Sequence, residues 1–218
     1  MTQITHGFRS ILSSSYIYDT FQTLVGAERF RQRITERYLR PMPGMQIIDV
    51  GCGTGAMLEQ LPEGVIYHGF DLSPAYIEHA KNKFGSVGEF HCADVANATK
   101  LGLPKADLVI AIGLLHHLDD AEAVGLIRDI MQLLTPSGRC VAVDPCFDEN
   151  QSRIARWLLE RDRGQNVRDK SGYLSLTYSL AVKAKIEISH DLLRIPYTHS
   201  ILEFNAQSST QSSAGLAS

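Results

Sequence analysis

Apolar runs of strand length alternate along the chain with segments of helical periodicity. Five such runs predict strands at 47–50, 65–70, 89–95, 107–112 and 139–143. Helices are predicted between them at 56–61, 73–84 and 120–134, the last capped by Asp119 or Asp120. Each proline- or glycine-containing turn separates one element from the next. This alternating order is typical of a parallel α/β sheet.

The two ends of the chain follow other patterns. Residues 18–39 have helical periodicity, and Pro41–Gly44 ends that helix. Two further helices are predicted at about 148–163 and 171–181. The segments 186–189 and 200–204 then alternate apolar and polar residues, which predicts an antiparallel hairpin at the far edge of the sheet.

These elements predict one domain over residues 1–205, with a helical lid at about 10–40. We expect an α/β fold with a seven-stranded mixed sheet, helices on both faces and the last strand antiparallel. Residues 206–218 are mostly Ser, Gln, Ala and Gly, so they cannot bury much apolar surface. We therefore expect this tail to be disordered.

The segment Ile47–Gly55 is the most informative stretch of the chain. An apolar strand carries Asp49 near its end, and Gly51, Gly53 and Gly55 follow. Glycine lets the backbone turn sharply and lets a ligand approach closely, as in Rossmann-like nucleotide sites. Asp49 would repel the pyrophosphate of a dinucleotide, which argues against a dehydrogenase. It would attract S-adenosylmethionine, which carries a cationic amine and a sulfonium.

The sequence here resembles the class I S-adenosylmethionine-dependent methyltransferases, whose first motif reads acid-x-Gly-x-Gly-x-Gly. The resemblance covers roughly residues 40–205 and implies a three-layer Rossmann-like sandwich with a reversed last strand. The stretches Tyr18–Gln22, Arg161–Asn166 and His190–His199 resemble a group of small bacterial methyltransferases, a likeness that identifies no substrate.

Acidic residues at the ends of the second and third strands are candidate cofactor ligands. Asp71 can accept hydrogen bonds from both ribose hydroxyls, although it could instead be an acid that precedes a helix. The resemblance implies that Asp94 accepts from the adenine amino group and that the Val95 amide reaches the ring. By itself Asp94 could equally be a turn aspartate. The predicted cofactor site is completed by Leu72, Ile112 and, from the lid, Tyr18 and Gln22.

The stretch 112–120 follows the fourth strand and contains His116 and His117. It is similar to the family loop x-x-Leu-His-His-Leu, which covers the methionine end of the cofactor. Histidine has a suitable pKa for a general base, and we prefer His117 over His116, His190 and His199. Both members of the first pair could instead be packing residues. The Asn/Asp-Pro-Pro-aromatic motif of amide and adenine-N6 methyltransferases is absent here.

The composition of the chain limits the cellular compartment and the binding partners that we expect. The 21 basic and 24 acidic residues give a net charge of -3, which argues against a nucleic-acid partner. The four cysteines form no C-x-x-C pair, so we expect no metal site and a reduced, cytoplasmic setting. The sequence contains no run of 18 apolar residues, so we expect no membrane span. Residues 1–15 contain no continuous apolar stretch, so we do not expect secretion. Oligomeric state is left open.

We therefore expect a methyltransferase that acts on a small molecule, on oxygen or else on carbon or nitrogen. An RNA or protein acceptor, and a non-catalytic scaffold that only binds the cofactor, are the alternatives. The charged stretch 160–170 is expected to be a solvated loop. Arg161, Arg163 and Arg168 could instead recognise an anionic group on the substrate, because guanidinium suits phosphate and carboxylate.

Overall fold

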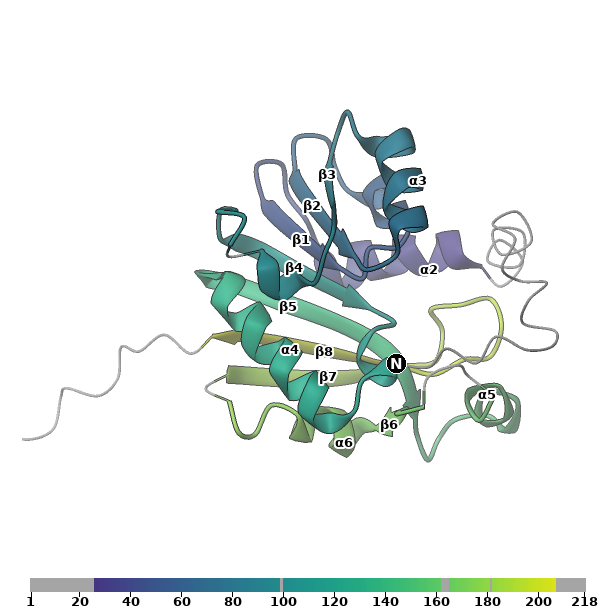
Figure 1. The fold of residues 1–218 in the computed structure, drawn as a ribbon. Helices are drawn as coiled ribbons and strands as arrows, with labels where there is room; N and C mark the ends of the chain where they lie inside the picture. Colours follow the sequence, from purple (N-terminus) through teal and green to yellow (C-terminus); the bar gives the residue numbers. More distant parts are fainter. Residues whose placement is uncertain (1–25, 99, 162–164, 181, 207–218) are drawn as a thin grey trace, which may run out of the picture.

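Seven strands form the main sheet in the order β3-β2-β1-β4-β5-β8-β7 (Figure 1). The computed structural model describes residues 26–98, 100–161, 165–180 and 182–206. The strands are β1 Gln46–Val50, β2 Ile66–Asp71, β3 Glu89–Cys92, β4 Ala106–Ile112, β5 Leu134–Phe147, β7 Val182–Ser189 and β8 His199–Ala206. A two-residue strand, β6 Arg168–Asp169, pairs with the end of β5.

β8 is the one reversed strand of the main sheet in the described part of the chain. It lies between β5 and β7 and pairs with both in antiparallel register. The other neighbouring pairs are parallel. The predicted mixed sheet with an antiparallel last strand is therefore confirmed. This order brings the carboxyl ends of β1 to β5 and the start of β8 to one edge, which we call the carboxyl edge.

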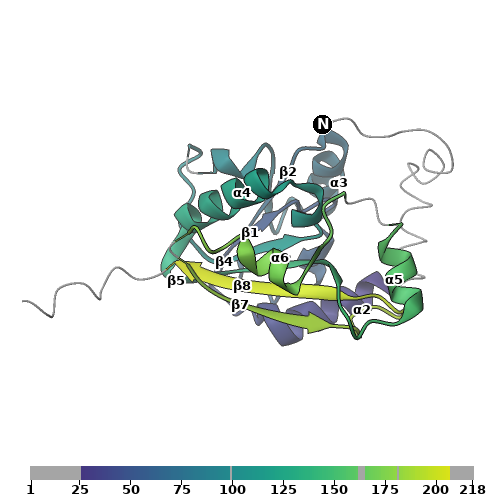
Figure 2. The same cartoon turned by 90° about the horizontal axis from the view of Figure 1, so that it is seen from below.

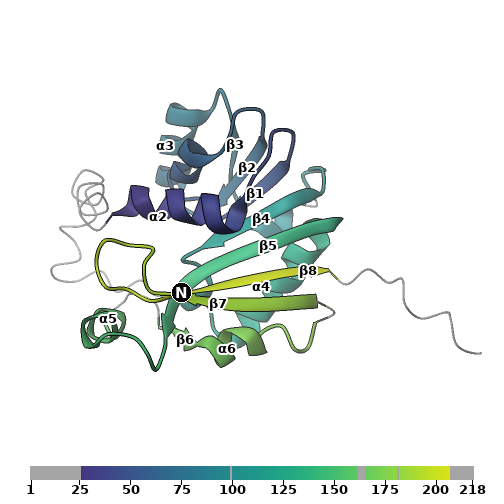
Figure 3. The same ribbon diagram turned by 180° about the vertical axis from the view of Figure 1, so that it is seen from behind.

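Helices cover both faces of the sheet (Figures 2 and 3). The helices are α2 Ala27–Ile34 with a π-helical extension over Thr35–Leu39, α3 Pro74–Phe84, α4 Asp120–Leu133, α5 Arg153–Leu159 and α6 Lys170–Ser175. Short 3-10 turns cover Ala56–Gln60, Val95–Asn97 and Leu115–His117. α2 and α3 pack into one core cluster, and α4 and α6 into the other. The sheet is therefore the middle of three layers.

α4 illustrates how the sequence sets these helices. Asp119 accepts a hydrogen bond from the backbone N–H of Glu122, and the Glu122 carboxylate accepts one from the N–H of Asp119. This capping box satisfies two N–H groups that have no partner inside the helix. The apolar face that follows is buried against the sheet through Ala123, Ile127 and Ile130. Local capping and helical periodicity thus agree, as predicted.

Several elements differ from the predicted bounds. β5 begins directly at Leu134, which pairs with Ala106, and Arg139 then pairs with Leu108. The stretch 135–138 is therefore a bulge in a longer strand, although its turn residues predicted a break. α5 and α6 are shorter than predicted. β3 ends at Cys92, because Asp94 caps a 3-10 turn instead of continuing the strand.

Some predicted features fall outside the described residues. They are the lid before residue 26, with Tyr18 and Gln22, and the tail after residue 206. The described residues of the lid segment begin at Gly26 and continue as α2. Among the described helices, none is both long and apolar enough to cross a membrane.

Two glycines should respond oppositely to substitution by alanine. A Cβ on Gly125, inside α4, would meet no atom within 4 Å, whereas one on Gly138 would lie 2.5 Å from the carbonyl oxygen of Ala106. We expect Gly125→Ala to raise the free energy of unfolding by about 0.5–1 kcal/mol, since alanine restricts the unfolded chain. Gly138→Ala should lower it by about 1–3 kcal/mol through overpacking. Urea unfolding measures both, and a destabilised Gly125→Ala variant would contradict the α4 packing.

Candidate active site

The glycine-rich loop between β1 and the first 3-10 turn lies at the carboxyl edge. Gly51, Gly53 and Gly55 have φ values of 73°, 55° and 77°, in the left-handed region that glycine adopts readily. The two N–H groups of residues 51 and 52 donate to the carbonyl of Phe70, at 2.8 and 3.0 Å. A Cβ on Gly55 would lie 2.9 Å from the Phe90 ring. The loop is thus a fixed turn that exposes backbone without side chains.

Asp71, the last residue of β2, joins this loop to the start of α3. Its Oδ2 accepts from the backbone N–H of Gly53 at 3.0 Å, and its Oδ1 accepts from that of Ser73 at 2.8 Å. A carboxylate has about four acceptor positions, so these bonds leave capacity for other donors. The Ser73 hydroxyl, not Asp71, accepts from the first turn of α3 at Tyr76. Asp71 is therefore more than a helix-start acid.

Asp49 lies in the interior beneath the loop. It is 2% exposed, and the Tyr67 hydroxyl donates to its Oδ2 at 2.7 Å. Burial raises the pKa of Asp49 to about 7; the Tyr67 hydrogen bond opposes this shift, and the negative charge of Asp71 adds to it. A carboxyl group with this pKa gains or loses its proton near neutral pH, so a nearby cation would favour its ionised form.

An exposed acidic side chain and an exposed apolar side chain follow the ends of β3 and β2. Asp94 is exposed, and its Oδ1 accepts from the N–H of Ala96 at 2.9 Å. Leu72 is 65% exposed, whereas Val95 is buried and Ile112, at the end of β4, is half-buried. An exposed leucine and exposed carboxylate oxygens at neighbouring strand ends could offer a flat ring an apolar face and hydrogen-bond acceptors.

The loop after β4 brings His116 to the same edge. A Cβ on Gly113 would lie 3.7 Å from Cε1 of His116, and one on Gly51 would lie 3.6 Å from Leu114. His116 is buried and His117 is exposed, with their ring centroids 4.0 Å apart. The histidine loop therefore packs directly on the glycine-rich loop.

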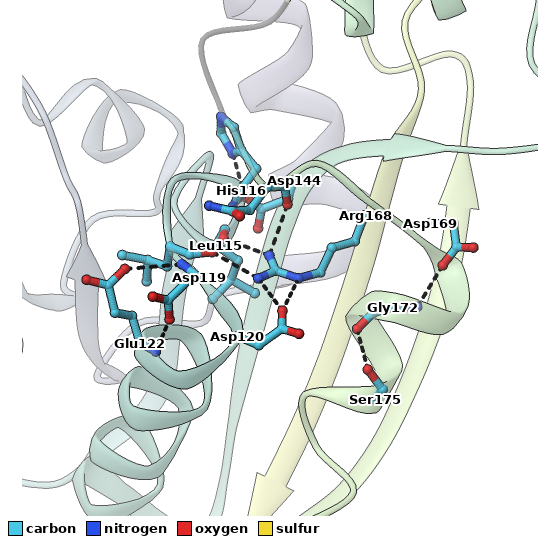
Figure 4. A network of polar contacts seen from close by, with 12 residues as sticks. Leu115, His116, Asp119, Asp120, Glu122, Asp144, Arg168, Asp169, Gly172 and Ser175 are labelled. Carbon is cyan, nitrogen blue, oxygen red and sulfur yellow. Dashed lines mark hydrogen bonds and ion pairs between the residues drawn. The ribbon is translucent and has the colours of Figure 1, made fainter. Parts of the chain in front are cut away.

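Asp144, near the end of β5, fixes the orientation of His116 (Figure 4). Its Oδ1 lies 2.8 Å from His116 Nδ1 and also accepts the backbone N–H of His116 at 3.1 Å. Both side chains are buried. Because the carboxylate can only accept, we assign the proton to Nδ1, which leaves Nε2 as the basic nitrogen.

Arg168 holds this loop in place from the opposite side (Figure 4). Its guanidinium donates to Asp120 Oδ1 at 2.7 and 2.9 Å, and to the carbonyl oxygens of Leu115 and Leu118 at 3.0 and 2.9 Å. Arg161 instead lies over the Trp157 ring, 4.2 Å from its centroid. The predicted anion-binding role thus has little support at Arg168, and Arg163 lies outside the described residues.

The loop between β7 and β8 completes the edge. Nε2 of His190 lies 3.5 Å from the Asp148 carboxylate, and the His199 ring contacts the rings of Phe30 and Tyr197, with centroids 5.1 and 5.0 Å apart. These two histidines thus pack between elements that lie far apart in the sequence.

α2 is attached to the same loop through two arginines. The guanidinium groups of Arg33 and Arg37 reach the Asp191 carboxylate at 2.7 and 3.0 Å. These contacts position the described end of the predicted lid segment. The candidate lid contacts, Tyr18 and Gln22, lie outside the described residues.

Two residues of this edge were missed from the sequence. Asp144 has the same signal as Asp71, an acid that ends an apolar strand run, and the pattern could have predicted it. Tyr67 could not be found this way, because its contact with Asp49 depends on strand register.

A cavity of about 370 Å³ lies elsewhere, between α2 and β7–β8. It is lined by Arg37, Tyr38, Arg40, Lys185, Ile186, Glu187, Ile201 and Glu203. None of the predicted site residues in the described part of the chain lines it.

Comparison with known proteins agrees with this arrangement. A family profile described as a methyltransferase domain matches residues 48–140, from β1 into β5. Residues 48–140 therefore carry a methyltransferase domain, in agreement with the resemblance of the glycine-rich motif. Its similarity to the O-methyltransferase resE of Aspergillus sclerotiorum is 32% identity over 142 residues, covering 61% of this chain and 53% of that one. An O-methyltransferase of Pyrenophora dematioidea is 30% identical over 166 residues, covering 68% and 61%.

Solved structures show the same fold at low identity. The mitomycin 7-O-methyltransferase MmcR superposes with a TM-score of 0.67 at 18% identity, covering 93% of this chain and 62% of that one. The plantazolicin methyltransferase BamL, solved with a triazolic desmethylPZN analog and SAH, gives a TM-score of 0.64 at 16% identity and covers 93% and 92%. The chain spans between half and two thirds of the length of the two curated relatives named above.

The pKa of Asp49 generates a prediction about stability. Between the ordinary value of 3.8 and about 7 the folded state keeps a proton that the unfolded state loses. The parent should therefore lose stability as pH rises through this window, by at most about 1.4 kcal/mol per pH unit, and not change further above it. The Asp49→Asn variant has no proton to release at this position, so it should not lose stability in this way.

We expect the stability of Asp49→Asn relative to the parent to increase from about pH 4 to 7 and then to level off. Urea unfolding at a series of pH values measures the difference. A difference that does not depend on pH would show that Asp49 is ionised throughout, against the burial seen here.

Proposed function

We propose that the chain catalyses methyl transfer from S-adenosylmethionine to a small-molecule acceptor, on oxygen. The observation that carries this proposal is the fixed glycine-rich loop, bound to Asp71 and packed against the His116 loop at one sheet edge. O-methyltransferase relatives support the reaction type, and structural neighbours named for small-molecule methylation support the acceptor class.

The residues at the carboxyl edge fit the parts of this cofactor. Asp71 would accept the ribose hydroxyls with the acceptor capacity that its two backbone bonds leave. Asp94 would accept the adenine amino group, and Leu72, Val95 and Ile112 would flank the ring. The side-chain-free backbone of the glycine-rich loop permits the close approach that such a ligand needs.

Asp49 would interact with the cofactor through its electrostatic field and not through a direct contact. It is buried beneath the loop, so it acts at short range in a medium of low dielectric constant. The positive charges of the cofactor favour its ionised form, and ionisation in turn strengthens binding. This coupling gives the acid of the first motif a physical role although little of its surface is exposed.

The bound cofactor supplies a methyl group on a sulfonium, which is already activated for displacement. The protein has to align the acceptor, keep water out and receive a proton. We assign the last role to His116, whose Nε2 accepts the hydroxyl proton as the oxygen–methyl bond forms and the sulfur–methyl bond breaks. Asp144 is a positioning residue that holds the required tautomer. We propose His116 in place of His117, because Asp144 orients the buried His116 ring whereas the His117 side chain is exposed.

Methyl transfer from labelled cofactor into fractionated cell extract tests the proposed function. We expect label in a small-molecule fraction, and we expect Asp71→Ala to weaken cofactor binding by about 1.5–3 kcal/mol, the range for a hydrogen bond to a charged group. Asp129→Ala, on α4, is the matched control and should bind as the parent does. Label that enters RNA and is lost on RNase treatment, or label in protein, would overturn the acceptor class. No transfer in any fraction would favour a scaffold.

The base assignment predicts unequal effects of the two neighbouring histidines. We expect His116→Gln to lower kcat by about 10²–10⁴-fold, the usual range for a general base, and His117→Ala to lower it by less than about tenfold. Asp144→Asn should shift the pH profile of kcat as well as its height, since the tautomer is no longer fixed. Steady-state kinetics on variants of unchanged circular dichroism would measure this. Equal, small losses for both histidines would mean that no strong base is used.

A further inference from the structure

Three potential metal ligands meet on the outer strands of the sheet, away from the carboxyl-edge loops. His68 lies on β2, and Glu89 and His91 lie on the edge strand β3. His68 pairs with Glu89 across the parallel ladder, and His91 is two residues further on, so the three side chains share one face. One ligand atom from each lies within 4.8 Å of the others.

One nitrogen of each imidazole in this cluster faces the Glu89 carboxylate without a hydrogen bond. His68 Nδ1 and His91 Nε2 are buried and make no hydrogen bond within the part of the chain that the structure describes. The side chain of His68 is 7% exposed. Buried polar atoms are nearly always paired, and an ion bound between these nitrogens and the carboxylate would pair both of them.

The two distances from the Glu89 carboxylate are close to those between the ligand atoms of a tetrahedral metal site. Glu89 Oε2 lies 3.4 Å from His68 Nδ1 and 3.9 Å from His91 Nε2. A tetrahedral zinc site with bonds of about 2.0–2.1 Å places its ligand atoms about 3.3 Å apart. A small rotation of the Glu89 side chain, which is 68% exposed, would shorten the longer of these two distances. The two imidazole nitrogens lie within 4.8 Å of each other, and the rings would turn to bring them to the spacing of a tetrahedral site.

We propose that His68, Glu89 and His91 form a binding site for a divalent transition-metal ion of the zinc type. Two imidazoles and one carboxylate are the ligands of three-coordinate protein sites for zinc, which leave a fourth position for water. Magnesium and calcium prefer oxygen ligands, and this cluster has only one carboxylate. None of the three residues was singled out by the sequence, because their spacing matches no cysteine–histidine motif.

The ion would link β3 to β2. β3 is a four-residue strand with a neighbour on one side only among the described residues, so few backbone bonds hold it. A bond from the ion to each strand would add a cross-link between β2 and β3. The same two strands lead to Asp71 and Asp94, so the site supports the proposed nucleotide half without touching it.

Titration of the tag-free full chain with Co²⁺ and Zn²⁺ tests the site. At about pH 7.5, above the ordinary histidine pKa of about 6.5, we expect one ion per chain. Cobalt should give the visible absorption bands of tetrahedral coordination, and zinc should displace it. Zinc should also raise Tm and slow hydrogen exchange of the β3 amides.

Glu89→Gln is the central variant, because its side chain is exposed and the change leaves the core intact. We expect Glu89→Gln and His91→Gln each to weaken zinc binding by more than about tenfold. Even the loss of a residue that only supports a metal ligand weakens binding by about tenfold or more, and these two residues would bind the ion directly. His79→Gln, on the exposed side of α3, and Cys92→Ser are the controls and should bind as the parent does. Unchanged affinity in Glu89→Gln, or loss of binding in Cys92→Ser, would overturn the proposal. Because each readout is binding or stability, the result does not depend on methyl transfer.

Discussion

The carboxylate of Asp71 joins the glycine-rich loop to the start of α3 through one hydrogen bond to each. Gly53 donates from a left-handed turn, and Ser73 donates from the residue that caps the helix. The turns of the loop therefore form against a charged acceptor that is fixed at the end of a strand. Together with the bonds from residues 51 and 52 to the Phe70 carbonyl, this acceptor offsets the conformational entropy of the glycines and gives the loop one shape. The nucleotide half of the proposed site depends on this anchor.

The second half of the site is held by a different set of charges. Asp144 binds both the ring and the backbone of His116, and Arg168 binds two carbonyls of the same loop. The loop after β4 is thus fixed from β5 on one side and from the segment before α6 on the other (Figure 4). The Leu114 side chain of this loop, which would lie 3.6 Å from a Cβ on Gly51, connects the two halves. Both halves are preformed, as alignment of a displacement reaction requires.

The sequence predicted the order of elements and the helix starts well, because hydrophobic periodicity and capping act locally. Asp119 and Ser73 cap their helices where the pattern placed them. Side-chain partners were harder to predict, because they depend on register and on which loops meet. The burial of Asp49 under Tyr67 is set by parallel pairing of β1 with β2, and the contrast between His116 and His117 is set by Asp144. Two neighbouring residues of the same type can therefore differ in exposure.

The central claim is that this carboxyl edge holds the nucleoside. A crystal structure of the full chain with S-adenosylhomocysteine tests it most directly. We expect the ribose hydroxyls on Asp71, the adenine amino group on Asp94 and the amino-acid end beside the glycine-rich loop. A nucleoside bound elsewhere, such as in the cavity lined by Tyr38 and Glu187, or ribose hydroxyls beyond hydrogen-bond reach of Asp71, would contradict the account.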